Sequence, residues 1–287
     1  MCRWMAWFGQ PVLLRELVFD SPHGIVDQSL HARMGAEPTN GDGFGLGWYD
    51  AHDGPGVYHS VAPAWSDPNL RELAGHIPSP LFLVHVRAAI GSPVQTTNCH
   101  PFRHGRWLFV HNGYVERFSQ LRRDLMLQVR PDLFSAVQGS TDTEVLFHLA
   151  LTLGLEDEPL RAMERTVGLV EDVAERHGVA DPVQGSFGIS NGEQLWAVRY
   201  ASSGSARTLF VSADFDTIRR LHPDDSRLAR MTSDDRMIVS EPFSDLPGVW
   251  VPVDESTALT VRHGGVCEHT PFRPQRETGD QASSLAF

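Results

Sequence analysis

The sequence predicts a single α+β domain in which helices and sheets pack in layers. Strand-like segments occupy the first and last thirds of the chain, and helical periodicity dominates the middle. No Ser/Gly-rich linker or internal repeat divides the 287 residues, a length that can bury a sizeable core. We therefore expect one domain over residues 2–270 and a loosely held, flexible tail over 271–287, where Pro, Arg, Gln, Ser and Asp predominate.

The first part of the chain combines strands with short helices. Residues 1–10 alternate small and bulky apolar side chains, which is typical of a strand that begins at the terminus. One or two short helices follow over 13–34, and then a glycine-rich strand over 40–49. Its G-x-G-x-G spacing lacks the helix start of a phosphate loop, so we expect glycines that let another backbone or a ligand come close. Apolar runs at 81–86 and 107–111 predict two further strands.

The middle of the chain is helical and the last third returns to strands. Apolar periodicity predicts helices over 115–127, 143–153 and 158–177, the second opened by a capping region at 140–142. The strands predicted after them cover 186–189, 194–200, 208–212, 237–241 and 257–262.

The composition excludes several classes of partner. With 24 Lys and Arg against 36 Asp and Glu, the formal charge of -12 opposes binding to nucleic acid or to an anionic membrane. No apolar run reaches the ~18 residues that a membrane span needs. Cys2, Cys99 and Cys267 form no C-x-x-C pair, which argues against a disulfide framework and fits a reducing compartment. We expect a cytoplasmic protein with a small polar substrate.

The cysteine at position 2 is the strongest functional signal. If the initiator methionine is removed, the thiol and a free α-amino group lie on the same residue. Their ordinary pKa values are roughly 8.5 and about 7.7 to 8.0, so near neutral pH the amine can take the thiol proton, directly or through one water. Cys2 is therefore a candidate N-terminal nucleophile. The alternative is that Cys2 is a small residue at the start of a strand.

Three further polar groups lie at or just beyond predicted strand or helix ends. An enzyme that cleaves the side-chain amide of an amino acid must bind an α-carboxylate and an α-ammonium, which suit Arg87 and Asp142. It must also stabilise a negative oxygen, which the Asn112 amide and the Gly113 backbone N–H can do together. The alternatives are a surface-paired arginine, a common Asn-Gly hairpin turn and a simple helix cap at Asp142.

Other kinds of catalytic site have weaker support. The histidines raise a metal hypothesis, but no four-ligand set has a recognised spacing, so we predict no metal and no other cofactor. A serine hydrolase is disfavoured because the chain has no G-x-S-x-G elbow. The metal candidates considered are Cys99, His100, His104 and His111 in one group, and Glu144 with His148 in another.

Four separated motifs occur in one order along the chain. In that order they resemble the class II glutamine amidotransferases, which are N-terminal-nucleophile (Ntn) hydrolases, over about residues 1–265. The resemblance implies a four-layer α/β/β/α sandwich. The motifs are Met1-Cys2, His85-Val86-Arg87, His111-Asn112-Gly113 and Ser140-Thr141-Asp142-Thr143-Glu144.

The resemblance also implies a role for each candidate residue. Cys2 would be the nucleophile, Asn112 and Gly113 the oxyanion hole, and Arg87 and Asp142 the groups that bind the carboxylate and amine of glutamine. Two short motifs are similar to the stand-alone γ-glutamyl amidohydrolases of the ergothioneine pathway. These motifs are Met1-Cys2-Arg3-Trp4 with Pro22-His23-Gly24, and Ser240-Glu241-Pro242-Phe243.

Two functions follow from these inferences. The leading one is a glutamine amidotransferase-like amidohydrolase that cleaves a γ-glutamyl amide, either glutamine or a γ-glutamyl conjugate, through a Cys2 thioester. The alternative is a non-catalytic member that binds glutamine or a γ-glutamyl ligand, or a partner that supplies ammonia to a separate synthase. In either case the expected partners are a small γ-glutamyl molecule and a separate synthase or a second copy of the chain.

Overall fold

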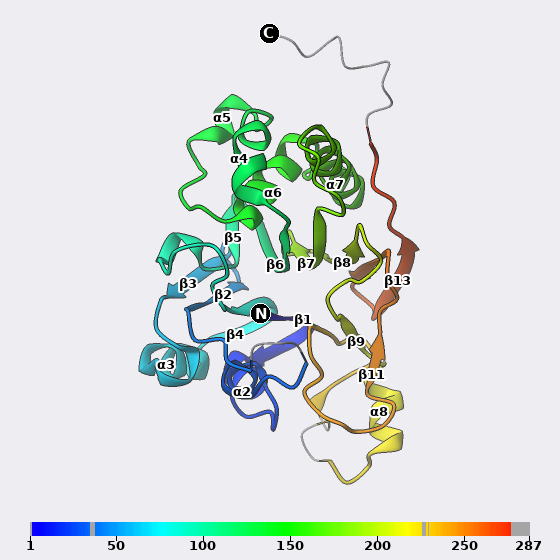
Figure 1. The fold of residues 1–287 in the computed structure, drawn as a ribbon. Coiled ribbons are helices and arrows are strands. Elements are labelled where there is room, and N and C mark those ends of the chain that lie inside the picture. The colour runs from blue at the N-terminus through cyan, green and yellow to red at the C-terminus, as the bar shows by residue number, and fades with distance from the viewer. Residues whose placement is uncertain (1, 35–37, 226–227, 229, 277–287) are drawn as a thin grey trace.

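Two antiparallel sheets face each other, and helices cover the outer face of each sheet (Figure 1). The computed structural model describes residues 2–34, 38–225, 228 and 230–276. In Figure 1, α4, α5, α6 and α7 lie at one end of the molecule and α2, α3 and α8 at the other, with the strands between them.

The seven-stranded sheet holds the first strand of the chain near its middle. Its strand order is β11-β9-β10-β1-β4-β2-β3, with antiparallel pairing throughout, so both edges of β1 are paired. Its strands are β1 (Arg3–Leu13), β2 (Phe44–Tyr49), β3 (Gly56–Ser60), β4 (Pro78–Val86), β9 (Phe210–Ser212), β10 (Arg236–Val239) and β11 (Trp250–Pro252).

The six-stranded sheet has the order β13-β12-β8-β7-β6-β5 and is also antiparallel. Its strands are β5 (Phe102–His104), β6 (Trp107–Val115), β7 (Val183–Ser190), β8 (Leu195–Ala201), β12 (Thr257–Arg262) and β13 (Val266–Pro271). The α-helices are α1 (Leu14–Val18), α2 (Ile25–His31), α3 (Pro68–His76), α4 (Phe118–Met126), α5 (Pro131–Phe134), α6 (Asp142–Thr152), α7 (Pro159–Arg176) and α8 (Phe215–Leu221).

The apolar core forms three layers, which follow from the alternation of side chains along each strand. In β1, Trp4 and Phe8 point into the layer between the two sheets, whereas Met5 and Trp7 point into the layer beneath α1, α2, α3 and α8. A third layer packs the outer face of the six-stranded sheet against α4, α6 and α7. This is the predicted four-layer α/β/β/α sandwich, and the predicted fold class is confirmed.

Most predicted elements are present, with shifted ends. The two short helices broken at residues 21–24 are α1 and α2, and the glycine-rich strand is β2. The predicted end of a strand at Asn112-Gly113 is wrong, because β6 continues to Val115. The predicted helix from residue 115 therefore begins only at Phe118. Several elements had no predicted counterpart, namely β3, α3, α5, β5, α8, β11 and β13.

The first residues of the predicted tail are packed rather than loose. Phe272 is buried, with 2% of its surface exposed, and its N–H donates to Ser256 O at 2.8 Å. The backbone N–H groups of Arg273 and Gln275 each bond Glu164 of α7 at 2.9 Å. After β13 ends at Pro271, residues 272–276 therefore lie along α7. The rest of the predicted tail, 277–287, lies outside the described residues.

Gly45 of β2 bears out the expectation that this strand meets another backbone closely. A Cβ atom at Gly45 would lie 2.0 Å from His100 O, a backbone atom that cannot move aside by rotation. We expect Gly45→Ala to lower the free energy of unfolding by about 1 to 3 kcal/mol. Gly75 in α3 is the matched control, because a Cβ there meets nothing within 4 Å. Gly75→Ala should raise stability by about 0.5 to 1 kcal/mol; urea unfolding of both variants measures the difference.

Two expectations drawn from the composition can be compared with the structure. Cys2, Cys99 and Cys267 are all free thiols, as their spacing predicted. Across the described ranges, no helix has both the length and the apolar character that crossing a bilayer requires.

Candidate active site

One cavity of about 360 Å³ brings together all five residues that the sequence singled out. They lie directly before β1, directly after β4, within β6 and at the start of α6, and so draw on both sheets and on the helical layer beyond the six-stranded sheet. The five are Cys2, Arg87, Asn112, Gly113 and Asp142.

Cys2 lies directly before β1 and beside the end of β4. Arg3 pairs with Val86 in the ladder, so Cys2 stands next to Arg87. The thiol donates to Ala88 O at 3.6 Å. Burial raises the pKa of the Cys2 thiol and the charge of Asp142 adds to this, whereas the Ala88 bond and Arg87 act in the opposite direction. The thiol is therefore protonated at neutral pH, and a base is needed to generate the thiolate.

Arg87 is a buried cation, with 2% of its surface exposed. Its Nη2 donates to Ser92 Oγ at 2.7 Å and to Pro93 O at 3.1 Å. Its Nη1 donates to Asp42 O at 3.4 Å. All three partners are neutral, and among the described residues no carboxylate forms an ion pair with Arg87. The surface-paired arginine of the alternative reading is therefore absent, and a buried guanidinium of this kind suits an anionic ligand.

Asn112 and Gly113 lie inside β6 rather than in a hairpin turn. They pair in register with Ser186 and Gly185 of β7. Val115 still pairs with Val183 of β7, but its N–H points to the other edge of β6 and donates to Asp142 Oδ2 at 2.7 Å. Backbone N–H directions alternate along an antiparallel pair, so the N–H of Gly113 points to the same open edge as that of Val115.

Different physical reasons explain the asparagine at position 112 and the glycine at position 113. Asn112 is buried, with only 3% of its surface exposed, yet no described residue forms a hydrogen bond with its side-chain amide. The amide therefore keeps its N–H donors for a ligand in the cavity. Gly113 is required by space: a Cβ there would lie 2.0 Å from Gln184 O and 2.4 Å from His111 Nε2. Close approach, rather than an unusual backbone conformation, explains this glycine.

Asp142 is the first residue of α6 and not its cap. The cap is Thr141, whose side chain accepts from Glu144 N at 3.3 Å. The Asp142 carboxylate bridges two elements, since it accepts from Val115 N and from Thr143 N, both at 2.7 Å. A carboxylate has about four acceptor positions, so Asp142 retains capacity for an ammonium group.

Three buried histidines lie behind the predicted residues. His85 and His111 were noted as parts of motifs, and His100 and His111 as candidate metal ligands, but their grouping was not predicted. His100 and His111 line the cavity, and the rings of His85 and His100 are 4.1 Å apart. Burial, with a contribution from the charge of Arg87, lowers the pKa of His85 to about 3. Burial also lowers the pKa of His100 and of His111, although Asp142 opposes the shift at His111. These rings are neutral near pH 7, so the positive charge beside them is that of Arg87 and not of an imidazolium.

A bond between the two sheets fixes Cys2 relative to Asn112. The Trp4 Nε1–H donates to Ser186 Oγ at 3.0 Å, and Ser186 is the β7 residue opposite Asn112. Gly188 makes room for this ring, since a Cβ there would lie 2.9 Å from it. The contact ties the start of β1 to β7, which pairs with the strand β6 that carries the predicted oxyanion hole.

Glu144 and His148, which were considered as a pair of metal ligands, have other partners. Glu144 accepts from Gln138 N and Gly139 N, and His148 Nδ1 bonds Glu144 O at 2.8 Å. In the part of the chain that the structure describes, no three His, Cys, Asp or Glu side chains are grouped to hold a metal ion.

The chain is similar to known proteins over most of its length. The family model described as glutamine amidotransferases class-II matches residues 17–284. This chain belongs to the class-II glutamine amidotransferase family. The match begins after Cys2, so the assignment of a nucleophile rests on the geometry described above.

Two relatives of this glutamine amidotransferase align over almost the whole chain. The Saccharomyces cerevisiae protein named "Probable glutamine amidotransferase DUG3" is 30% identical over 300 residues, 94% of this chain and 84% of that protein. The gamma-glutamyl-hercynylcysteine sulfoxide hydrolase of Mycolicibacterium smegmatis is 29% identical over 268 residues, 93% of this chain and 98% of that protein.

Solved structures agree with the observed fold. A glutamine aminotransferase class-II domain protein from Silicibacter pomeroyi superimposes with a TM-score of 0.71 at 33% identity, covering 95% of this chain and 100% of that one. The glutamine phosphoribosylpyrophosphate amidotransferase of B. subtilis matches with a TM-score of 0.64 at 15% identity, covering 96% of this chain and 50% of that one. The second likeness shows the shared Ntn-type fold.

Proposed function

We propose that this protein is an amidohydrolase that cleaves a γ-glutamyl amide through a thioester on Cys2. The observation that carries the proposal is the single cavity that gathers Cys2, Arg87, Asn112, Gly113 and Asp142. A thiol, a buried guanidinium without a carboxylate partner among the described residues, a free amide donor and a carboxylate together meet the chemical needs of a glutamyl group.

The substrate is held by its amino-acid end. The Arg87 guanidinium binds the α-carboxylate, because it is a buried donor fork without an anionic partner in the described chain. The Asp142 carboxylate accepts hydrogen bonds from the α-ammonium. With both charges fixed, the γ-carbonyl reaches Cys2, which lies beside Arg87 at the ends of β1 and β4.

Acylation forms a carbon–sulfur bond and breaks a carbon–nitrogen bond. After removal of Met1, the free α-amine of Cys2 takes the thiol proton, and the thiolate attacks the γ-carbonyl carbon. The Asn112 amide N–H and the Gly113 backbone N–H stabilise the resulting oxyanion. The amine then gives its proton to the leaving nitrogen, which departs as ammonia or as an amine.

Deacylation reverses the roles of the same groups. A water molecule gives a proton to the α-amine and attacks the thioester carbon, and the oxyanion forms again at the same two donors. Collapse of the intermediate expels the Cys2 thiolate, which recovers the proton. The products are glutamate and the free enzyme.

The outer part of the cavity suits a substituent on the substrate amide. Tyr114, Arg117, Arg122 and Arg207 line this cavity, and the Arg207 guanidinium lies 5.6 Å from the centre of the Tyr114 ring. The buried Nε of Arg122 has no hydrogen-bond partner among the described residues. These cations suit an anionic leaving amine, and the γ-glutamyl conjugate in the name of the mycobacterial relative supports a substrate larger than glutamine.

The test is glutamate release from three compounds: L-glutamine, γ-glutamyl-p-nitroanilide and γ-glutamylglycine. Asparagine and α-glutamylglycine are the matched controls, since one is shorter and the other carries the peptide bond at the wrong carboxyl group. We expect glutamate from the γ-glutamyl compounds, no glutamate from α-glutamylglycine and no aspartate from asparagine. Tight binding without release from any compound would instead support the non-catalytic alternative.

Arg87→Lys should act mainly on substrate binding. A lysine keeps the charge but loses the planar fork, so we expect KM to rise by about 10- to 100-fold and kcat to change less. Steady-state kinetics with L-glutamine measure both. Arg103→Lys is the control, because Arg103 is exposed and bonds Pro55 O, away from the cavity. An unchanged KM in Arg87→Lys would remove Arg87 from the carboxylate site.

We also propose a cytoplasmic location. It is supported by the three free cysteines, which a reducing compartment maintains. A separate synthase that uses the released ammonia, or a second copy of this chain, remains a proposed partner. Light scattering of the purified protein measures whether it is oligomeric.

A further inference from the structure

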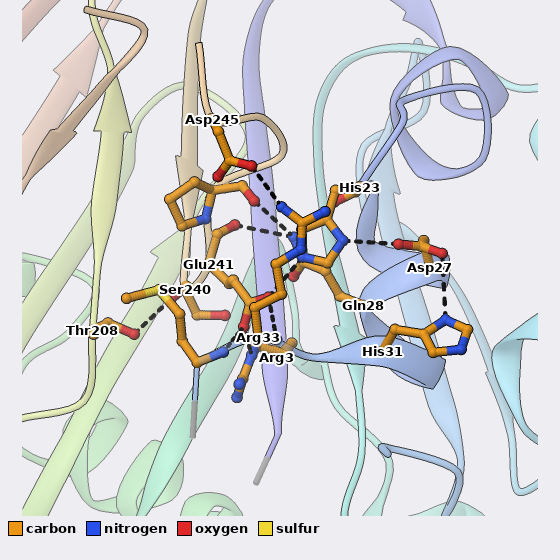
Figure 2. Close-up of polar contacts among 12 residues, drawn as sticks. Arg3, His23, Asp27, Gln28, His31, Arg33, Thr208, Ser240, Glu241 and Asp245 are labelled. Atoms are coloured by element: carbon orange, nitrogen blue, oxygen red, sulfur yellow. Dashed lines mark hydrogen bonds and ion pairs between the residues drawn. The ribbon is translucent and has the colours of Figure 1, made fainter. Parts of the chain in front are cut away.

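The carboxylate of Glu241, just beyond β10, is buried and saturated with hydrogen bonds (Figure 2). Only 1% of Glu241 is exposed. Oε1 accepts from His23 Nε2 at 2.7 Å and from Arg33 N at 2.8 Å. Oε2 accepts from Arg3 Nε and from Met34 N, both at 2.9 Å. These four bonds use the acceptor capacity of one carboxylate.

Glu241 is ionised in this environment. Burial pushes the pKa of its carboxyl group upward, but the bonds from Arg33, His23 and Met34 and the charge of Arg3 outweigh burial and hold the pKa below its ordinary value. The buried pair of Arg3 and Glu241 is thus charged on both sides near neutral pH.

Arg3 connects this carboxylate to the predicted nucleophile. The Nε of Arg3 bonds Glu241, while its Nη1 donates to the carbonyl oxygen of Cys2 at 3.0 Å. The adjoining strand is fixed as well, because Trp4 N donates to Ser240 Oγ and Ser240 N donates to Trp4 O, each at 3.0 Å. A continuous chain of contacts therefore runs from Glu241 to the backbone of Cys2.

We propose that Glu241 is a positioning residue for the Cys2 nucleophile and acts through Arg3. The inference rests on the proposed function. Cys2 precedes the first residue of β1, so the ladder does not hold its carbonyl, and the Arg3 bond restrains that group instead. A misplacement of about 1 Å in a reacting group can cost about 100-fold in rate.

The rest of the network keeps Glu241 itself in place. His23 Nδ1 bonds Asp27 at 2.8 Å, and the Gln28 amide donates to His23 O at 2.9 Å and to Glu241 O at 3.1 Å (Figure 2). These contacts fasten α2 to the segment after β10. Truncation of Glu241 to alanine would leave Arg3 as a buried charge, so the conservative Glu241→Gln is the informative change.

The first experiment measures kcat and KM of Glu241→Gln well below its unfolding temperature, per active site titrated with 6-diazo-5-oxo-norleucine. We expect kcat to fall by about 10- to 100-fold while KM changes by less than about threefold. Asp245→Asn is the matched control, because it makes the same chemical change at an exposed partner of Arg33 (Figure 2). A wild-type kcat in folded Glu241→Gln would overturn the proposal.

A second variant tests whether the effect passes through Arg3. A lysine cannot reproduce a guanidinium that bonds Glu241 and the Cys2 carbonyl at once, so Arg3→Lys should lose kcat to a similar extent. The double variant should lose no more than about the larger single loss, because the two residues act as one unit. Multiplicative losses would mean independent roles and would overturn the proposal.

These outcomes separate this inference from the proposed function. Wild-type protein that neither hydrolyses γ-glutamyl amides nor reacts with 6-diazo-5-oxo-norleucine would refute the function and this inference with it. Wild-type protein that does both, beside a Glu241→Gln variant of equal kcat, would refute the inference alone.

Discussion

Cys2→Ala is expected to abolish γ-glutamyl hydrolysis, with kcat reduced by at least about 10,000-fold, and to leave the fold intact. Alanine removes the nucleophile, and no other described cysteine lines the cavity. The change is small and the residue half-buried, so the unfolding temperature should stay close to that of the wild type. Glutamate release and circular dichroism measured on the same preparation give both readouts.

Cysteines outside the cavity provide the control for this variant. Cys267 lies in β13, with its thiol 3.9 Å from His269, and Cys267→Ala should keep wild-type activity. Full activity in Cys2→Ala would remove the thioester mechanism altogether. Loss of activity in Cys267→Ala alone would indicate that the wrong thiol has been assigned.

Asn112→Ala should give the second largest loss, about 100- to 1,000-fold in kcat, with KM within a few-fold of wild type. The reason is that an oxyanion forms only during the reaction, so a donor aimed at it contributes to the barrier and not to ground-state binding. The Asn112 amide forms no hydrogen bond with described residues, so its removal breaks no hydrogen bond among them. Steady-state kinetics with L-glutamine separate the two constants.

A structural asparagine serves as the comparison. Asn191 lies in the half-buried connection between β7 and β8, where its Oδ1 accepts from Glu193 N and Gln194 N at 3.0 Å. Asn191→Ala should lower stability slightly and leave kcat unchanged. If Asn112→Ala raised KM and kept kcat, Asn112 would be a binding group rather than part of an oxyanion hole.

Local sequence pattern was sufficient to identify most elements and the five candidate residues. The alternation of apolar residues through Trp4, Ala6 and Phe8 predicted β1, and both faces of that strand are indeed buried. The apolar run before Arg87 predicted β4, which ends at Val86, directly before Arg87. These signals are local, because side-chain periodicity reflects which face of a strand or helix is buried.

The same reasoning failed where side-chain polarity does not follow the backbone pairing. Asn112 is polar because it borders the cavity, and Gly113 lacks a side chain because a Cβ there would meet Gln184 O. The backbone nevertheless continues in β6 to Val115. The polar composition after residue 271 suggested a tail, although backbone bonds to Glu164 hold residues 273–275 on α7. Backbone pairing of this kind leaves little trace in composition.

Long-range partners could not be predicted from one sequence. Glu241 was noticed as part of a short motif, but its contact with Arg3 joins residues 238 positions apart. The Trp4–Ser186 bond spans 182 positions and crosses from one sheet to the other. Such contacts depend on sheet order and register, which tertiary packing decides.

The most direct test of the central claim is the intact mass of the purified protein before and after incubation with 6-diazo-5-oxo-norleucine, a glutamine analogue that alkylates such nucleophiles. We predict a starting mass that lacks Met1 and a single adduct that peptide mapping locates on Cys2 and that Cys2→Ala does not form. A hydrolytically active protein that retains Met1, or an adduct that persists in Cys2→Ala, would contradict the N-terminal cysteine mechanism.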